Sequence, residues 1–151
     1  MTKKDRVIMD KKVSKSLSFQ LKAIDLLSIG LNPPSKPIGP EVTFAFNFDI
    51  EHRLNLENNI IVVICSIEIL EESERISIGN LSTRFTYELK DLDDFIDGET
   101  KKVSFPDDFI FNLNTISLST VRGIMYSNFK GTFLHNAYLP IIDTKGLKPN
   151  K

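Results

Sequence analysis

Few residues in this chain are of the types that perform chemistry. The sequence contains two histidines, His52 and His135, and a single cysteine, Cys65. The histidines are far apart in the sequence, and one cysteine excludes both a disulfide framework and a cysteine-based zinc site. No Walker loop, GxGxxG, GxSxG, HExxH or CxxC motif is present. We therefore expect no catalytic residue, no metal and no cofactor, and we predict that the protein is not an enzyme.

Two features resemble reactive sites but have simpler explanations. Pairs of carboxylates occur at positions 93–94 and 107–108. A solvated turn explains the first pair and a helix start explains the second. Neither pair is expected to bind a metal, because a metal site needs further ligands held at fixed geometry. Cys65 is the last residue of the longest apolar run of the chain, which begins at Ile60. This position predicts a buried, unreactive thiol. This run is far shorter than the roughly 20 residues that span a bilayer, so we expect no membrane insertion.

The composition is that of one folded domain. The chain has 151 residues, of which 41% are hydrophobic and 26% are charged, and its formal net charge is −1. This apolar share can build a core, and the near-zero net charge argues against nucleic-acid binding, which needs a basic surface. The basic N-terminus is not followed by an apolar segment, which argues against secretion and favours the cytoplasm. We expect a flexible basic arm over residues 1–15 and a single domain over residues 16–151.

Alternation of apolar and polar residues predicts four strands. The first begins at Leu17 and changes phase near Ala23, which indicates a bulge or a strand end. The others run from 42 to 51, from 60 to 70 and from 75 to about 90, with a bulge expected at 79–80. In the second strand we expect one face to be buried, comprising Val42, Phe44, Phe46, Phe48 and Ile50.

The first two predicted strands are joined by a long loop, and the last is followed by a helix. Residues 30–40 include four prolines and two glycines, which excludes a helix or a central strand. The segment is also too long for a hairpin turn, so the chain should cross to a non-adjacent strand. From Phe109 onward, apolar residues recur at helical spacing, and Gly131 is a natural stop. The pattern predicts a helix over residues 106–129 with Ser104 as its N-cap. The fold class is therefore α+β: a four-stranded antiparallel sheet with a Pro-rich crossover loop, followed by one long helix packed on the sheet.

This order of elements resembles the SecB-like export-chaperone family. In that family the long helix tends to end in Gly-Thr, with a proline nine residues after the glycine, as Gly131, Thr132 and Pro140 do here. The stretch around Arg122 is also similar to part of the family's helix. The resemblance covers residues 17 to about 142 and is specific in sequence only over residues 121–141. After Pro140 the chain departs from the family, because the second helix is shortened or absent.

The resemblance implies an ATP-independent holdase that binds unfolded or precursor polypeptides, with protein export as one setting. An alternative is a dedicated interaction module, such as a toxin–antitoxin-associated SecB-like chaperone or an adaptor. The implied partners are unfolded polypeptides together with an export motor ATPase or an antitoxin. A third possibility, an enzyme on an α+β scaffold, would need converging polar residues that the sequence does not provide.

Three groups of site residues follow from these expectations. Apolar side chains of the loop, the second strand and the tail should line a client groove: Leu31, Ile38, Phe44, Phe133, Leu134, Tyr138 and Leu139. An acidic cluster is either a solvated strand end or a docking patch for a basic partner: Glu68, Glu71, Glu72 and Glu74. The resemblance implies a dimer with sheets joined edge to edge and a tetramer with helices packed between sheets. Helix residues expected at that oligomer interface are Ile110, Val121, Met125 and Phe129.

Overall fold

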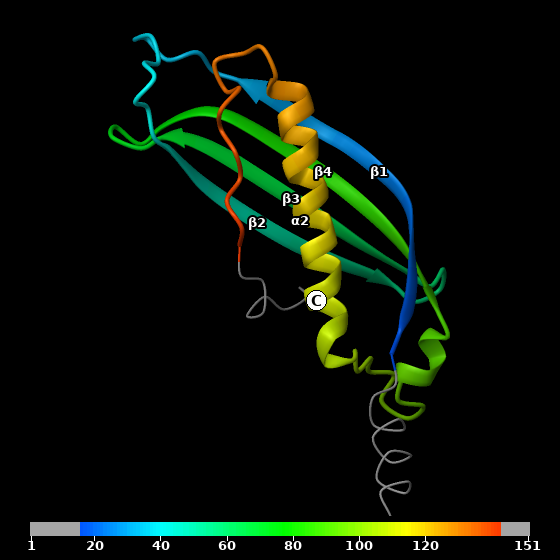
Figure 1. Cartoon of the computed structure of the whole chain (residues 1–151). Helices are drawn as coiled ribbons and strands as arrows, with labels where there is room; N and C mark the ends of the chain where they lie inside the picture. The colour runs from blue at the N-terminus through cyan, green and yellow to red at the C-terminus, as the bar shows by residue number, and fades with distance from the viewer. Residues whose placement is uncertain (1–15, 143–151) are drawn as a thin grey trace, which may run out of the picture.

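The computed structural model describes residues 16–142 and contains one antiparallel sheet and one long helix (Figure 1). The strands are β1 (Ser18–Leu31), β2 (Phe44–Asn55), β3 (Ile60–Glu71) and β4 (Ile76–Lys90). A 3₁₀ turn, η1 (Leu92–Phe95), precedes the helix α2 (Asp107–Phe129). The sheet order is β1-β4-β3-β2, so the loop between β1 and β2 crosses from one edge of the sheet to the other. The predicted fold class is confirmed, and the expected arm at residues 1–15 lies outside the described residues.

Register shifts in β1 explain its change of phase. The pairing of β1 with β4 slips at Lys22 and again at Leu27, so each of these residues is an extra residue in β1. Because each bulge advances the strand by one residue, the apolar positions return to the helix-facing side. Ile24 pairs with the buried Phe85, and Leu26 pairs with the buried Thr83. The predicted bulge near Ala23 therefore lies one residue earlier, and β1 continues through it to Leu31.

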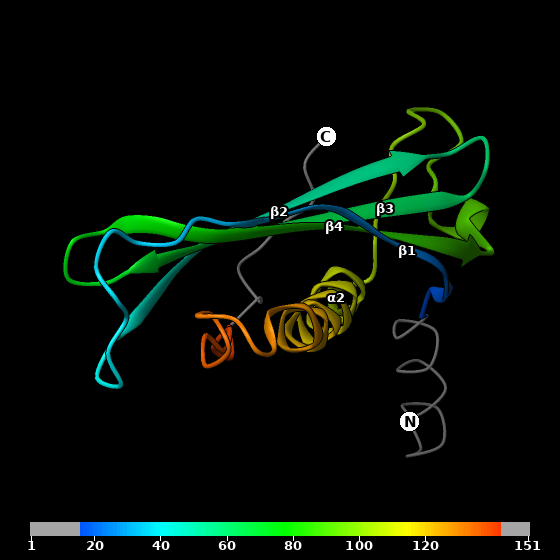
Figure 2. The same cartoon turned by 90° about the horizontal axis from the view of Figure 1, so that it is seen from above.

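The helix covers one face of the sheet and packs against β3 and β4 (Figure 2). The first turn of α2 follows Pro106, and the expected cap Ser104 instead donates its backbone N–H to the carbonyl of Phe95 at 2.8 Å. On the other face of the sheet, polar side chains form cross-strand pairs: Asn47 with Glu68, Ser66 with Ser82, and Arg84 with Asp25. The sheet therefore has an apolar face under α2 and a largely polar face opposite.

The position of α2 leaves one expected core face only partly covered. Ile50 is buried, Phe44 and Phe46 are half-buried, and Phe48 is 37% exposed. The predicted register of β2 is correct, because these residues share the helix-facing side with buried residues of β3. Their burial is incomplete because β2 is an edge strand and α2 lies over the two central strands.

The predicted oligomer-interface residues of the helix need correction. The structure buries all four in the core between α2 and the sheet: Ile110, Val121, Met125 and Phe129. Val121, Met125 and Phe129 are four apart and Ile110 lies about three turns before Val121, so all four share one face of the helix, and this is the face that packs on the sheet. These side chains therefore have no surface left for a partner chain. The outward side of α2 instead presents Ile116, which is 40% exposed, and Tyr126, which is 49% exposed.

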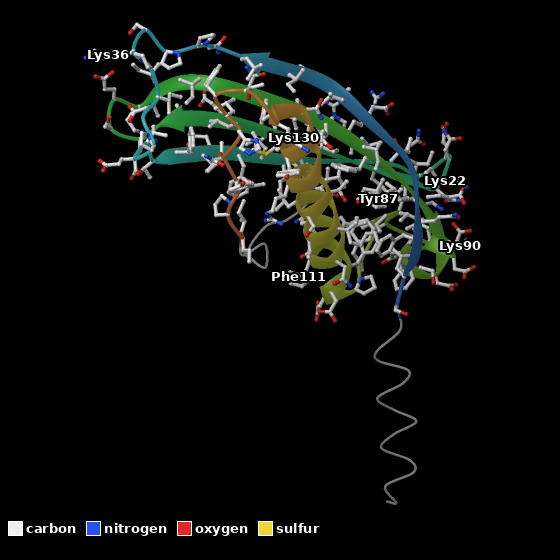
Figure 3. All side chains as sticks on the ribbon, turned by 45° about the horizontal axis from the view of Figure 1, so that its top comes forward. Lys22, Lys36, Tyr87, Lys90, Phe111 and Lys130 are labelled. Atoms are coloured by element: carbon white, nitrogen blue, oxygen red, sulfur yellow. The ribbon has the colours of Figure 1, made fainter. Side chains whose placement is uncertain are left out.

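A buried polar layer crosses the interface between sheet and helix. Nε2 of His52 lies 2.7 Å from Oδ1 of Asn114, and the hydroxyls of Tyr87 and Ser117 lie 2.8 Å apart. Tyr87 extends from β4 toward α2 in Figure 3. Within residues 16–142, no partner is found for three buried atoms: Nδ1 of His52, Nδ2 of Asn114 and Oγ1 of Thr83. Because buried polar groups without partners are costly, these three atoms reduce the stability of the packing between α2 and the sheet.

The buried imidazole makes stability depend on pH. Burial lowers the pKa of His52, and the hydrogen bond with Asn114 opposes this effect. The unfolded imidazole has a pKa of about 6.5, so below that pH the unfolded state binds a proton that the folded state resists. The free energy of unfolding should therefore fall as the pH drops below about 6.5, until the lower folded-state pKa is passed.

Urea unfolding at pH 7.5 and at pH 5.5 measures this dependence. His52→Gln removes the titrating group and retains an amide that can hydrogen-bond to Asn114, so its stability should fall less over this interval than that of the wild type. Equal loss of stability in the two proteins would contradict the assignment to His52.

Candidate functional site

The crossover loop forms one wall of the candidate site and is fastened at both ends. At its start, Asn32 N–H donates to the carbonyl of Ile78 at 3.0 Å, and at its end, Glu72 N–H donates to the carbonyl of Thr43 at 2.9 Å. Prolines at positions 33, 34, 37 and 40 restrict the backbone between these anchors. The loop therefore stands beside the sheet as a stiff wall.

The segment after the helix forms the opposite wall. Gly131 has a φ of 81°, in the left-handed region that favours glycine, and there the chain turns away from α2. Thr132 satisfies the last turn of the helix, because its N–H and its hydroxyl both donate to the carbonyl of Phe129. Arg122 then holds the segment by donating to the carbonyls of Leu139 at 2.7 Å and Pro140 at 2.9 Å. Residues 130–142 consequently run back beside α2 (Figure 1).

Between these walls lies a cavity of about 310 Å³ that is lined by both apolar and polar residues, the polar ones being Thr132, His135 and Asn136 of the tail. Ile38 comes from the loop, Phe44 from the start of β2 and Phe133 from the tail. On the other side of the loop is a groove of about 750 Å³ between loop residues 34–43 and the β3–β4 turn. The two spaces share four loop residues, namely Ile38, Gly39, Pro40 and Val42. The loop thus presents apolar side chains to two neighbouring hollows.

The structure brings together only part of the predicted client groove. Ile38, Phe44 and Phe133 line the cavity. Leu31 is 41% exposed and Tyr138 is 52% exposed, and neither contributes to its lining. The remaining two predicted residues, Leu134 and Leu139, are buried in the core. Their position in a short terminal segment gave no sign of this burial.

Two residues that hold the tail in place were not predicted. Arg122 fastens the tail, and Tyr126 stacks on Tyr138 with the ring centroids 6.4 Å apart and the planes at 20°. The two residues are four apart and therefore lie on the same side of α2. This spacing was the available signal that one side of the helix receives the tail.

The acidic cluster is divided by the sheet. Glu72 and Glu74 are exposed in the β3–β4 turn and line the larger groove. Glu71 accepts hydrogen bonds from Ser73 and from the backbone of Glu74, and these bonds lower its pKa, with the Ser73 hydroxyl as the main cause. Glu68 lies on the polar face, where it accepts from Asn47 at 3.0 Å. Three of the four carboxylates, Glu71, Glu72 and Glu74, therefore border the groove beside the loop, and Glu68 does not.

The groups that could react are placed as core residues. Cys65 is fully buried, and its burial raises the pKa of the thiol to about 12, which agrees with the predicted unreactive cysteine. Residues 16–142 contain no group of three or more His, Cys, Asp or Glu side chains that could hold a metal ion. In the same part of the chain, no helix combines the length and apolar character required to cross a membrane.

The comparisons with known proteins are structural. No family model and no curated protein matches the sequence. A search of solved structures finds the SecB-like chaperone Rv1957 of Mycobacterium tuberculosis, solved in complex with a ChAD peptide from the HigA1 antitoxin. The match has a TM-score of 0.54 and 14% sequence identity, and it covers 82% of this chain and 90% of that chain.

This chain has a SecB-like fold. The match confirms the fold that the resemblance implied, with four antiparallel strands, a crossover loop and one long helix. A protein of unknown function from Streptococcus agalactiae also matches, with a TM-score of 0.40 and 11% identity over 77% of this chain and 90% of that chain.

Proposed function

We propose that this protein is an ATP-independent chaperone that holds unfolded polypeptide segments between its crossover loop and its tail. The observation that carries the proposal is the cavity to which Ile38, Phe44 and Phe133 contribute apolar side chains, bordered by a stiff loop with a larger groove on its other side. Apolar contacts of this kind bind many sequences, because they demand little of any one client side chain. The antitoxin peptide bound to the similarly folded Rv1957 supports a role in peptide binding.

The setting of this activity is either protein export or an antitoxin system, in the cytoplasm in both cases. The antitoxin setting is favoured by the Rv1957 complex, in which the bound peptide comes from an antitoxin. In the export setting, a motor ATPase would be a further partner. Glu72 and Glu74 on the rim of the larger groove would attract basic residues of a client or partner.

Suppression of aggregation tests the holdase proposal. The purified protein should slow light scattering by a chemically unfolded client in the absence of nucleotide, and ATP should not change the effect. If no unfolded client binds but a single antitoxin peptide does, the dedicated module is the correct function. If neither binds, the proposed function is wrong.

We also propose that the protein assembles through β1. This edge strand carries a row of apolar side chains on the helix-facing side that are each between 37% and 45% exposed: Leu21, Ile24, Leu26, Ile29 and Leu31. A long apolar edge strand invites pairing with another strand. Two copies joined edge to edge would pair the free backbone groups of β1.

Sedimentation equilibrium tests this assembly at micromolar concentration. The wild type should have at least twice the mass of the 17.2 kDa chain. Leu26→Lys with Ile29→Lys should shift the protein toward monomer, because a charge at a strand-pairing surface opposes association. A monomeric wild type would contradict the proposal, and so would an unchanged mass in the double variant.

A further inference from the structure

A second groove lies at the end of β2 that is remote from the crossover loop. It has a volume of about 820 Å³. Residues 51–54 of β2 form one wall, residues 101–105 form the other, and Leu56 and Ile61 lie between them. Residues 101–105 lead into α2. The client cavity lies at the start of β2, so most of the length of this strand separates the groove from the cavity.

The groove includes the outer edge of the sheet. Side chains alternate between the two faces of a strand, and yet four consecutive residues of β2 line this groove. This arrangement requires the groove to extend along the edge of the strand. β2 is last in the sheet order, and no strand of the described chain pairs with its outer side. Every second residue there directs its backbone N–H and C=O away from β3.

The charge of the groove is positive. Arg53, Lys101 and Lys102 line it against one carboxylate, Glu51, which forms an ion pair with Arg53. Neither Lys101 nor Lys102 takes part in an ion pair with another residue of the range 16–142. Both lysines are exposed at the rim of the groove. Two ammonium groups are thus available to an acidic ligand.

The groove also offers apolar surface. Leu54 is 37% exposed and Leu56 is 41% exposed, and Val103 and Phe105 on the opposite wall are half-buried. An unpaired strand edge binds extended backbone, while pockets beside it select alternate side chains. The combination therefore fits an extended chain that carries both carboxylates and apolar side chains.

We propose that this groove binds an acidic, extended segment of a partner polypeptide, which pairs with the outer edge of β2. The carboxylates of the segment contact Lys101 and Lys102, and its apolar side chains cover Leu54 and Leu56. This site is distinct from the client cavity and does not depend on the chaperone function.

Fluorescence anisotropy with the full chain tests the proposal. The probe is a labelled peptide of about ten residues in which glutamate alternates with isoleucine or valine, and the comparison peptide has lysine in place of each glutamate. The acidic peptide should bind, and its affinity should fall by about tenfold on raising the salt to about 0.5 M, because salt screens the lysine–carboxylate attraction. Equal binding of the acidic and basic peptides would overturn the proposal.

Substitutions locate the binding. Lys101→Asn with Lys102→Gln should weaken binding of the acidic peptide by about tenfold. Asparagine is chosen at position 101 because Lys101 has a φ of 60°, which asparagine tolerates. The matched control, Lys90→Gln with Lys130→Gln, removes the same charge from the end of β4 and the end of α2 (Figure 3). The control should bind as the wild type does, and equal affinities in all three proteins would contradict the site.

Backbone pairing has its own test. N-methylation of alternate residues removes the donors on one edge of an extended peptide. Methylation of the edge that faces β2 should abolish binding, and methylation of the other edge should leave it within about twofold. If both methylated peptides bind like the parent, strand pairing is wrong. Binding of hexanoate with the affinity of the peptide would show a small-molecule site and would also overturn the proposal.

Discussion

Replacing Ile38 and Phe133 with serine is expected to weaken the binding of unfolded clients by about tenfold or more. The two side chains come from opposite walls of the cavity, one from the crossover loop and one from the tail. Full burial of such a side chain contributes about 1.5–3 kcal/mol, and both are half-buried before any client binds. About half of this contribution is therefore left for each side chain when a client covers it. For the two side chains together this is at least about 1.4 kcal/mol, which is a factor of about ten in affinity.

The measurement is the dissociation constant of a labelled unfolded client, with the circular dichroism spectrum as a check on the fold. Ile116→Ser is the matched control, because Ile116 is 40% exposed on the outward side of α2, away from the cavity. The control should bind the client as the wild type does. If the double variant retains full affinity, client binding occurs elsewhere, and if the control loses as much, general apolar exposure explains the binding.

Gly79→Val is expected to lower the free energy of unfolding by about 2–3 kcal/mol and to displace the tail. A Cβ atom at Gly79 would lie 2.3 Å from Cδ1 of Leu134 and 3.5 Å from Cδ1 of Ile69. Leu134 is fully buried, so it has little room to move aside. Valine should therefore push the tail away from β4. Because the tail carries Phe133, client affinity should fall together with stability.

Urea unfolding and client binding measure the two effects, and two further variants isolate the cause. Gly123→Ala is the control, since no atom lies within 4 Å of a Cβ there, and it should stabilise α2 by up to about 1 kcal/mol. Leu134→Ala should destabilise the protein alone, but combined with Gly79→Ala it should cost less than the sum of the single changes, because the new methyl group occupies part of the vacated space. Strict additivity would contradict the contact between Gly79 and Leu134.

Local pattern determined the elements of this fold. Alternation over residues 60–70 and 75–90 predicted β3 and β4 to within a residue or two of their bounds, and the helical spacing after Phe109 predicted α2. These features could be predicted because backbone periodicity depends on neighbouring residues alone. The four prolines of the loop excluded a helix or a central strand there, because proline restricts its own backbone. The length of the loop then indicated a crossover.

The sequence also limited the chemistry of the protein. One cysteine inside an apolar strand predicted an unreactive thiol, and burial of Cys65 agrees with this. The cavity was predicted in part. Ile38 of the loop, Phe44 of β2 and Phe133 of the tail are apolar residues of segments that were expected to line a groove, and all three line the cavity.

Tertiary structure alone decided which apolar residues face outward. Met125 and Tyr126 are neighbours in sequence, but the rotation of α2 on the sheet buries the first and exposes the second. Leu134 is buried because Gly79, more than fifty residues away, lacks a side chain. The basic groove joins residues 51–54 to residues 101–105, and these meet only because β2 is an edge strand and the chain returns there before α2 begins. Each of these outcomes depends on packing between distant segments, and a local sequence pattern carries no information about which distant segment a side chain will contact.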